Sequence, residues 1–350
     1  MEGAALELQD LANSPEWGDG LMRAHHEVFG SDVDADWFRW KYAQGVGAGL
    51  FSNGELAAFC GGVPRTLWWR GQRLKGLQIT DVMVREPWRQ VGRRGGAFAR
   101  VCAALYGRQL GALAAGSGGG ERGALVHGAP FDLGYGFPSN RHLKLAEMLG
   151  LLRDGGPVMA AVWTDAARAV MDHVLGDAAP GADPWLAEEL DTAEALRAAQ
   201  RGWSLMRNAL HDTVVGERGW EVLHWRYAAQ PRGSTLGPVR FLGLRRPWHA
   251  WPSGVLVVRD GGHKATWLDW IGPPAMLRLA WAHALSLSLS RGAAEMHGWF
   301  SARPWAMLAQ TSAAGAGEVA RLGIPVAGRF TGQELAGASW WMMAGDTDFL

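Results

Sequence analysis

The sequence predicts a mixed α/β (α+β) protein built from two tandem units. Three observations support this fold class. Strand-like and helix-like stretches alternate along both halves of the chain. Short segments of the first half recur in the same order in the second half. The chain has 350 residues, whereas one domain usually has about 100–200. We therefore place a first domain at 1–164 and a second at 165–350.

The first half alternates apolar strand patterns with amphipathic helix patterns. Turn signals at 52–54 and 70–71 separate its middle strands, and the Gly-rich stretch 116–123 separates a helix from the next strand. Ser14 is the expected N-cap of the first helix. The pattern predicts strands near 6–8, 49–51, 55–69, 74–84, 124–130 and 158–163, and helices at 14–29, 36–42, 97–113 and 140–149.

The second half repeats this outline after an Ala- and Asp-rich helical connector at 165–202. The segment Asp36–Gln44 resembles Glu221–Gln230, and Ala124–Phe131 resembles Ala294–Phe300. These matches predict duplication of one unit, with chance similarity of short motifs as the alternative. Strands extend to about residue 270, followed by a helix at 276–290, a strand at 294–299 and a terminal strand in the sequence WWMMA.

Charge and cysteine content narrow the function classes. Lys+Arg and Asp+Glu both number 34, so no global field attracts nucleic acid or an anionic membrane. The two cysteines, Cys60 and Cys102, form no disulfide framework, which fits a cytoplasmic protein. The N-terminus lacks a signal peptide, and the helix 276–290 is too short to span a bilayer. No metal-binding spacing occurs, so we expect no metal.

The stretch "DVMVREPWRQVGRRGGAFARV" at 81–101 carries the strongest functional signal. A strand ends in a turn rich in arginine and glycine, and a helix follows. Backbone amides at a helix start bind anions, and arginines add bidentate contacts to phosphate oxygens. A pyrophosphate group is the expected ligand. The alternative is a solvated basic turn that only caps the helix.

The segment "VREPWRQVGRRGG" resembles the acyl-CoA-binding loop of the GNAT (GCN5-related) N-acetyltransferase superfamily. Val84, Trp88, Arg89 and Gly92 match its pattern, whereas Arg94 stands where the family prefers glycine. Downstream, "GYGFPSNRHLKLAEMLG" and the ending "WWMMAGDTDFL" resemble one GNAT subgroup. The resemblance implies a mostly antiparallel central sheet flanked by helices, with the fourth and fifth strands splayed apart.

The resemblance also implies an acyl-CoA cofactor, by default acetyl-CoA. The pantetheine arm would pair with the fourth strand, and the loop after it would hold the pyrophosphate. Asn140 resembles a family position that contacts the cofactor, with a simple helix N-cap as the alternative. The implied cofactor-binding residues are Val82, Met83, Val84, Arg89, Gln90, Val91, Gly92, Arg93, Arg94, Gly95 and Asn140.

Acyl transfer to an amine needs a base, stabilisation of an oxyanion, and an acid for the leaving thiolate. Asp81 occupies the position of the carboxylate that family members use as base, with a structural role as the alternative. The usual acid tyrosine is absent, because counting back from Gly150 reaches Ala146. The candidate catalytic residues are therefore Asp81, His127, Tyr135 and His142, where His127 ends a predicted strand and Tyr135 lies on a predicted loop.

The second half lacks a basic loop and has "DWIGPPAMLR" in its place, so we predict that it binds no CoA and instead completes the acceptor pocket. Its candidate lining residues are Trp225, Tyr227, Asp269 and His297. The partner is a small-molecule amine. The resemblance implies an amino sugar, with an amino acid or an aminoacyl-tRNA-dependent reaction as the alternatives. The oligomeric state stays open. The alternatives are a non-catalytic GNAT-like binding or scaffold protein and a protein that binds a hydrophobic ligand or partner through its many tryptophans.

Overall fold

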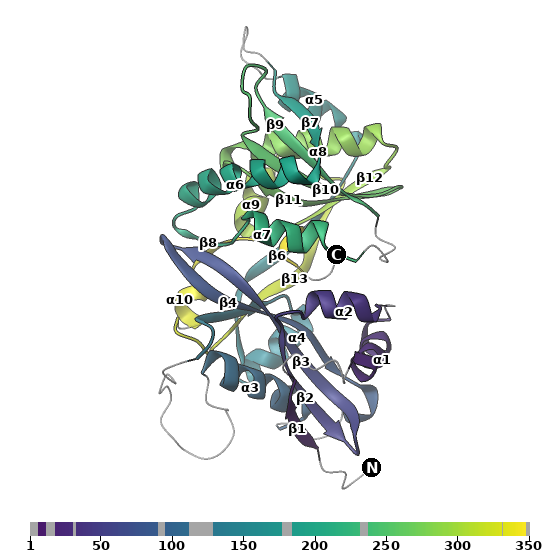
Figure 1. The fold of residues 1–350 in the computed structure, drawn as a ribbon, viewed down its shortest axis with the longest axis vertical. Helices are drawn as coiled ribbons and strands as arrows, with labels where there is room; N and C mark the ends of the chain where they lie inside the picture. Colours follow the sequence, from purple (N-terminus) through teal and green to yellow (C-terminus); the bar gives the residue numbers. More distant parts are fainter. Residues whose placement is uncertain are drawn as a thin grey trace. The chain divides into compact units, whose positions relative to one another are not determined.

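The computed structural model describes residues 6–11, 18–30, 33–89, 95–111, 129–176, 184–231, 237–330 and 332–347 (Figure 1). The chain divides into two compact units. Unit 1 comprises residues 1–66, 74–156 and 321–338, and unit 2 comprises residues 67–73, 157–320 and 339–350. Both units therefore take residues from both sides of the boundary predicted at residue 164.

Four strands pass from one unit into the other, namely β3 (Glu55–Trp69), β4 (Gln72–Val84), β6 (Leu152–Thr164) and β13 (Gly315–Pro325). The other elements of unit 1 are β1 (Glu7–Asp10), α1 (Gly18–Phe29), α2 (Ala35–Lys41), β2 (Val46–Ser52), η2 (Glu86–Trp88), α3 (Ala97–Leu110), β5 (Leu133–Gly136), α4 (Asn140–Met148) and α10 (Gly332–Ala336).

Apart from an added first helix and two added short strands, the other elements of unit 2 follow a succession of helices and strands similar to that of unit 1. They are η3 (Asp165–Ala167), α5 (Arg168–Gly176), β7 (Leu186–Leu190), α6 (Thr192–Ala209), β8 (Thr213–Gly216), α7 (Trp220–Leu223), the π-helical turn η4 (His224–Ala228), β9 (Val239–Arg245), β10 (Gly254–Gly261), β11 (Lys264–Ile271), η5 (Pro274–Met276), α8 (Leu277–Ser290), β12 (Glu295–Ser301), α9 (Ala302–Leu308), β14 (Ser339–Trp341) and η6 (Ala344–Asp346).

In the sheet, the strands of unit 1 have the order β1-β2-β3-β4-β5-β13, and those of unit 2, counted from the opposite edge, have the order β7-β9-β10-β11-β12-β6. The pairs β4–β5 and β11–β12 are parallel, whereas β1–β2, β2–β3, β9–β10 and β10–β11 are antiparallel. The two orders match strand for strand up to β5 and β12, which confirms a mostly antiparallel fold of two tandem units.

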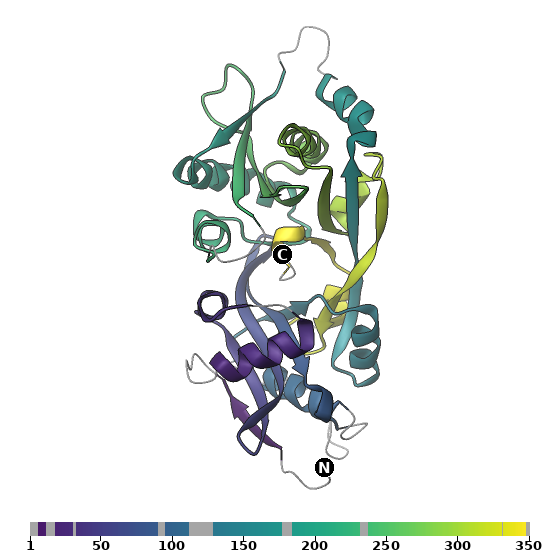
Figure 2. The same ribbon diagram turned by 90° about the vertical axis from the view of Figure 1, so that its right-hand side faces the viewer.

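The last strand of each repeat is exchanged. β6 follows α4 in the first half of the chain but pairs with β12, while β13 follows α9 in the second half and pairs with β5 through Gly323 and Gly136. Figure 2 shows β6 (teal) and β13 (yellow-green) running side by side, as their neighbouring places in the sheet require.

Helices cover both faces of the unit 1 sheet. On one face, Leu77 and Ile79 of β4 pack in a cluster that includes Val101 of α3. On the other, Met83 of β4 packs in a cluster that includes Phe38 of α2. The helices form where local signals favour them. For example, Asp34 caps α2 by accepting the Trp37 amide at 2.7 Å.

Several predicted elements differ from the structure. Of the strand predicted at 124–130, only residues 129 and 130 are described, and these two are not in a strand; the next described strand after α3 is β5. The connector 165–202 contains the strand β7 as well as helices. The strand β13 lies in a segment where the sequence suggested no strand. Each missed strand is held by its neighbours in the sheet rather than by local preference.

Candidate functional site

A gap opens in unit 1 where two parallel strands separate. β4 pairs with β5 only from Gly76 to Ile79, because β5 ends at Gly136 while β4 continues to Val84. After β5 the chain turns toward β13, where the Arg321 amide donates to the carbonyl of Pro138 at 3.1 Å. The stretch of β4 from Thr80 onward therefore extends past the end of β5.

The outer end of this gap is suited to an anion. The N-cap of α3 is Gly96, which offers no side chain to the first amides of the helix. Arg89 is exposed, and its Nε donates to the carbonyl of Val84 at 3.0 Å, which places its guanidinium at the end of β4.

His142 lies at the same end of the gap. Its ring stacks on Phe98 in the first turn of α3, with 6.5 Å between the ring centroids, and its Nδ1 lies 3.0 Å from Ser139 Oγ. Burial, and then the charges of Arg141 and Arg89, lower the pKa of His142. A neutral imidazole beside two arginines and a helix start can accept or donate hydrogen bonds to phosphate.

A buried polar network lies at the inner end of the gap. The carboxylate of Asp81 accepts Lys41 Nζ at 2.8–2.9 Å and the Tyr42 hydroxyl at 2.6 Å, and His25 Nε2 lies at 3.8 Å. The side chain of Asp81 is only 8% exposed. Its φ is +49°, a left-handed conformation that is unfavourable for a non-glycine residue and that the network sustains.

Two further buried polar groups lie next to this network along β4. Gln78 accepts Arg65 Nε at 2.8 Å. Thr80 is 5% exposed, and its hydroxyl has no hydrogen-bond partner among the described residues. No sequence pattern points to Thr80 or Arg65, and Lys41 and Tyr42 stand out only as part of a repeat.

The structure places only some of the predicted site residues. Val82, Met83 and Val84 lie on β4 beyond the end of β5. Gln90, Val91, Gly92, Arg93 and Arg94 lie outside the described residues, as does His127, while Gly95 is an exposed turn residue. Asn140 opens α4 and is exposed, but Ser139 is the N-cap, so the N-cap alternative for Asn140 was wrong.

The predicted loop position of Tyr135 was also wrong. Tyr135 lies on β5 directly opposite Gln78, is 2% exposed and packs edge-on against Phe137. The tetrapeptide Leu-Gly-Tyr-Gly forms a strand because β4 and β13 flank it.

Cys60 is a poor nucleophile. Cys60 and Cys102 are both buried and free. Burial, and then the neighbouring Cys102, raise the pKa of the Cys60 thiol well above its ordinary value. Because the thiolate is the reactive form, this environment disfavours an acyl-cysteine intermediate at Cys60.

Unit 2 repeats the aspartate network of unit 1. In each unit the aspartate lies two residues after the last parallel pair, which is Ile79 with Gly136 in unit 1 and Trp267 with Gly298 in unit 2. Asp269 accepts the Tyr227 hydroxyl at 3.3 Å, as Asp81 accepts Tyr42.

This register also corrects the predicted repeat. His297-Gly298 of β12 corresponds to Tyr135-Gly136 of β5, not to the sequence His-Gly at 127–128. The Trp-basic-Tyr match between the two halves agrees with the structure, because both tyrosines donate to the corresponding aspartates.

Arg218 neutralises Asp269 through two bonds of 2.9 and 3.1 Å and also bonds Asp346. Burial raises the pKa of Asp269 to about 6, although the guanidinium opposes that shift. Of the other predicted pocket residues, Tyr227 is buried, and His297 Nε2 lies 3.0 Å from Glu295.

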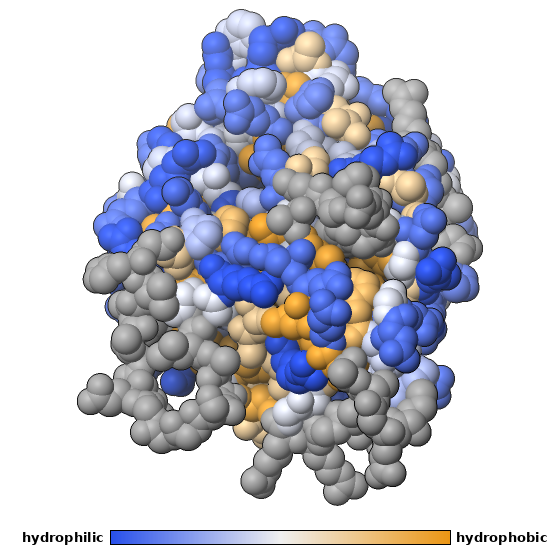
Figure 3. Space-filling model, turned by 60° about the horizontal axis from the view of Figure 1, so that its bottom comes forward, coloured by the Kyte–Doolittle hydropathy of each residue, from blue (hydrophilic) through white to orange (hydrophobic). Residues whose placement is uncertain are grey.

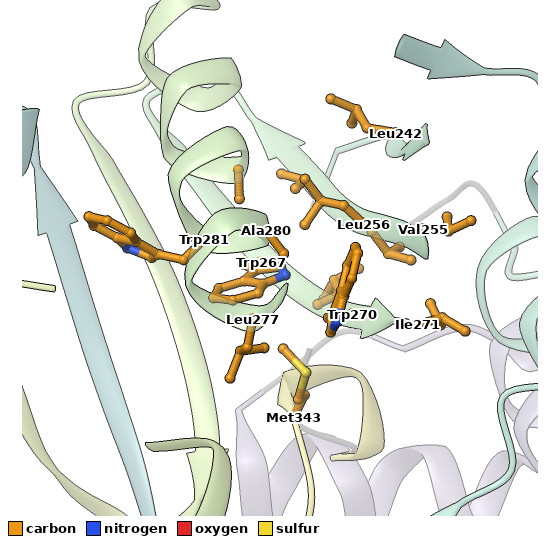
Figure 4. Close-up of a cluster of buried hydrophobic side chains, with 14 of the residues drawn as sticks. Leu242, Val255, Leu256, Trp267, Trp270, Ile271, Leu277, Ala280, Trp281 and Met343 are labelled. Atoms are coloured by element: carbon orange, nitrogen blue, oxygen red, sulfur yellow. The ribbon is translucent and has the colours of Figure 1, made fainter. Parts of the chain in front are cut away.

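The gap in unit 2 is filled by the C-terminal segment, residues 339–347. Met343 forms an antiparallel bridge with Phe300 of β12, and the Ser301 amide donates to the carbonyl of Met342 at 3.0 Å. On the other side, a Cβ on Gly345 would lie 2.9 Å from the carbonyl oxygen of Leu268 of β11. Figure 4 shows Met343 beside Leu277 and below the indoles of Trp267 and Trp270.

Other features of the described chain are less informative. A surface pocket in unit 2 is lined by Trp68, Trp69, Gly71, Arg207, Asn208, Leu210 and His211. Within the described ranges, no three His, Cys, Asp or Glu side chains are grouped so as to hold a metal ion. None of the helices described there has the length and apolarity that a membrane crossing needs.

Large exposed hydrophobic side chains occur in both units. The exposed tryptophans of the described residues are Trp220, Trp248 and Trp251, all in unit 2. Arg201 packs over the ring of Trp251 at 4.4 Å. Figure 3 shows one face of the molecule, on which hydrophobic patches lie between hydrophilic residues.

No protein-family model and no curated protein matches the sequence. Solved structures do match the fold. A probable N-acyltransferase from Enterococcus faecalis V583 matches with a TM-score of 0.64 and 11% identity, over 93% of this chain and 74% of that one. A GCN5-related N-acetyltransferase from Kribbella flavida matches with a TM-score of 0.61 and 15% identity, over 91% and 71%.

The Saccharomyces cerevisiae N-myristoyltransferase with bound myristoyl-CoA matches with a TM-score of 0.56 and 8% identity, over 92% of this chain and 79% of that one. These likenesses extend over nearly the whole chain and include both units. The chain therefore has the fold of the GCN5-related N-acetyltransferases, arranged as two tandem units.

Proposed function

We propose that the protein is an acyl-CoA-dependent N-acyltransferase whose unit 1 binds the cofactor. The observation that carries this proposal is the gap in unit 1, where β4 continues to Val84 after β5 has ended at Gly136. An extended pantetheine arm fits a strand edge of this kind, because its amides pair with the backbone as an added strand does. Acetyl-CoA is the proposed donor.

The phosphates of the cofactor would bind at the outer end of the gap. Arg89 and the start of α3 supply positive charge and backbone amides there. Asn140 at the start of α4 and His142 lie on the neighbouring helix. This placement makes His142 a cofactor contact rather than the acid at the thioester.

Transfer would proceed by direct attack of the amine on the thioester carbonyl. The C–N bond forms, the C–S bond breaks, and the thiolate leaves with a proton. Asp81 is the proposed base, and because its carboxylate is buried, the proton would reach it through the Tyr42 hydroxyl at 2.6 Å. Tyr135, buried on the neighbouring strand, is the proposed acid.

One cofactor is proposed for each chain. The C-terminal segment lies between β11 and β12 in unit 2, where an acyl-CoA would have to bind in that unit. Pro273 and Pro274 before α8 also remove amide donors from the turn that corresponds to the Arg-rich loop. The proposed acceptor is a small amine, with an amino sugar as the first class to test.

Titration calorimetry with CoA tests the cofactor site. We expect about one site per chain, and we expect Arg89→Ala with Arg94→Ala to weaken binding by roughly 2–4 kcal/mol, because charge-assisted contacts are lost and the two losses overlap. Arg153→Ala, an exposed arginine on β6, is the matched control and should leave affinity unchanged. Two equal sites, or unchanged affinity in the double variant, would contradict the assignment.

Thiol release from acetyl-CoA with a panel of amino sugars and other amines tests the reaction. Tyr42→Phe should lower kcat by about 100-fold with CoA affinity intact, since general-base help contributes on the order of 10²–10⁴. CoA binding without thiol release for any amine would instead favour a binding or scaffold role. An unchanged kcat in Tyr42→Phe would remove the proton relay from the mechanism.

A further inference from the structure

We infer that the hydroxyl of Thr80 is a hydrogen-bond donor to the thioester carbonyl oxygen of the acyl-CoA in unit 1. This inference rests on the proposed function and adds a catalytic residue to it. Thr80 is 5% exposed, and its Oγ1 has no partner in the described part of the chain. A buried hydroxyl without a partner costs free energy, and Thr80 directly follows the last described β4–β5 pair, so its hydroxyl is suited to a ligand that lies along β4 beyond that pair.

The position of Thr80 selects the thioester among the parts of acyl-CoA. Thr80 is the first residue of β4 after the last pair with β5, so it lies at the closed end of the gap. A Cβ on Gly136 would lie 2.9 Å from the carbonyl oxygen of Ile79, which leaves no room for a ligand to pass deeper. The phosphates would bind at the opposite end, beyond Val84.

The length of the gap fits this assignment. The four residue-to-residue steps from Thr80 to Val84 span about 13 Å at roughly 3.3 Å per step of strand. An extended pantetheine arm covers a similar length between its phosphate and its sulfur. A cofactor with its pyrophosphate beside Arg89 therefore brings its thioester to Thr80, next to the network of Asp81 and Tyr42.

Unit 2 provides an internal comparison. The residue that corresponds to Thr80, one position after the last parallel pair, is Leu268, which is 1% exposed. There the gap holds the protein's own segment around Met343 and Gly345. The position is apolar where the chain itself fills the gap and carries a hydroxyl where the gap is proposed to hold a thioester.

Thr80→Val removes the hydroxyl and keeps the shape, and Thr80→Ser keeps the hydroxyl. We expect Thr80→Val to bind acetyl-CoA roughly five- to tenfold more weakly than wild type, to bind CoA within twofold of wild type, and to retain or raise the thermal unfolding midpoint of the free protein. Thr80→Ser should resemble wild type. The infrared carbonyl stretch of bound, isotope-labelled acetyl-CoA should lie at lower frequency in wild type than in Thr80→Val.

Thr213→Val is the matched control for stability, because Thr213 is buried with its hydroxyl bonded by Arg303, and its loss should lower the midpoint. Equal acetyl-CoA affinity and equal carbonyl frequency in wild type and Thr80→Val would overturn the inference while leaving the proposed function in place. Equal weakening of CoA and acetyl-CoA would also overturn it. If wild type binds neither molecule, the proposed function fails together with the inference.

Discussion

Asp81 of unit 1 and Asp269 of unit 2 have partners of the same kinds. Each carboxylate accepts a tyrosine hydroxyl and pairs with a buried cation, which is Lys41 in unit 1 and Arg218 in unit 2. Breaking a buried ion pair by removing one partner is strongly destabilising, so both aspartates stabilise their units whatever else they do. Only Asp81 lies next to a gap that the C-terminal segment leaves unfilled, and this difference gives unit 1 its proposed chemistry.

A histidine in unit 2 makes stability depend on pH. His283 of α8 is largely buried, and burial lowers its pKa to about 4 from 6.5. The unfolded chain binds this proton more readily, so the contribution is complete above pH 6.5 and is lost as the pH falls toward 4. Between pH 7 and 5 the loss should be about 2 kcal/mol of unfolding free energy.

Denaturant unfolding at pH 7 and pH 5 measures this effect. His283→Gln should reduce the pH dependence by most of that amount. His263→Gln, which changes an exposed histidine in the β10–β11 turn, should leave the pH dependence as in wild type. Equal pH slopes in wild type and His283→Gln would show that this group does not carry the effect.

The sequence predicted individual site residues only where a motif marked them. Asp81 and the cluster Val82–Val84 were found through the loop pattern that follows them. Lys41 and Thr80 carry no such pattern, because their roles depend on neighbours far away in sequence. Lys41 lies 40 positions from the carboxylate that it binds, and the unpaired state of the Thr80 hydroxyl becomes visible only once the strands are placed.

Strand β5 determines where the gap begins. Gly136 lies opposite Ile79. A Cβ added to Gly136 would lie 2.9 Å from the carbonyl oxygen of Ile79 and 3.3 Å from the Cβ of Ile79. The backbone cannot yield easily, so a side chain at this position would push the two strands apart.

Gly136→Ala should therefore lower the unfolding free energy by about 1–3 kcal/mol and weaken acetyl-CoA binding. Gly20→Ala in α1 is the control, because nothing lies within 4 Å of its added Cβ and alanine favours a helix. Thermal unfolding and calorimetry measure both effects. If Gly136→Ala were as stable as Gly20→Ala, the close approach of the two strands would not constrain the site.

Elements with strong periodicity were predicted well, and elements set by their neighbours were not. β3, β4, α3 and α4 lie within a few residues of their predicted bounds, since long apolar runs and turn signals mark them. β5 has only four residues, two of them glycine, so its sequence carries no strand signal. β7 has the sequence Leu-Ala-Glu-Glu-Leu, which favours a helix, and it becomes a strand by pairing with β9.

At the scale of the whole molecule, the exchange of β6 and β13 joins the two repeats. Unit 1 needs residues 321–338 and unit 2 needs residues 157–164, although each set lies in the other half of the chain. Which strand pairs with which is a non-local choice that no local pattern in either strand encodes, so the sequence could indicate duplication but not exchange.

The exchange predicts that neither half is stable alone. Fragments 1–164 and 165–350, produced separately, should show cooperative unfolding weakly or not at all, because each lacks the strand beside its parallel pair. Produced together, they should form a one-to-one complex that unfolds cooperatively and binds CoA. Calorimetry and size-exclusion chromatography measure both properties, and a fragment 1–164 that unfolds as cooperatively as the full chain would contradict the prediction.

The same exchange sets the order of events while the protein is being made. As the nascent chain leaves the ribosome, β5 emerges about 185 residues before the strand that will cover its outer edge. At synthesis rates of about 5–20 residues per second, that edge of β5 stays unpaired for on the order of ten seconds or more, with its backbone amides and carbonyls exposed. An unpaired strand edge can pair with other chains, so the incomplete sheet is prone to aggregation until β13 has been synthesised.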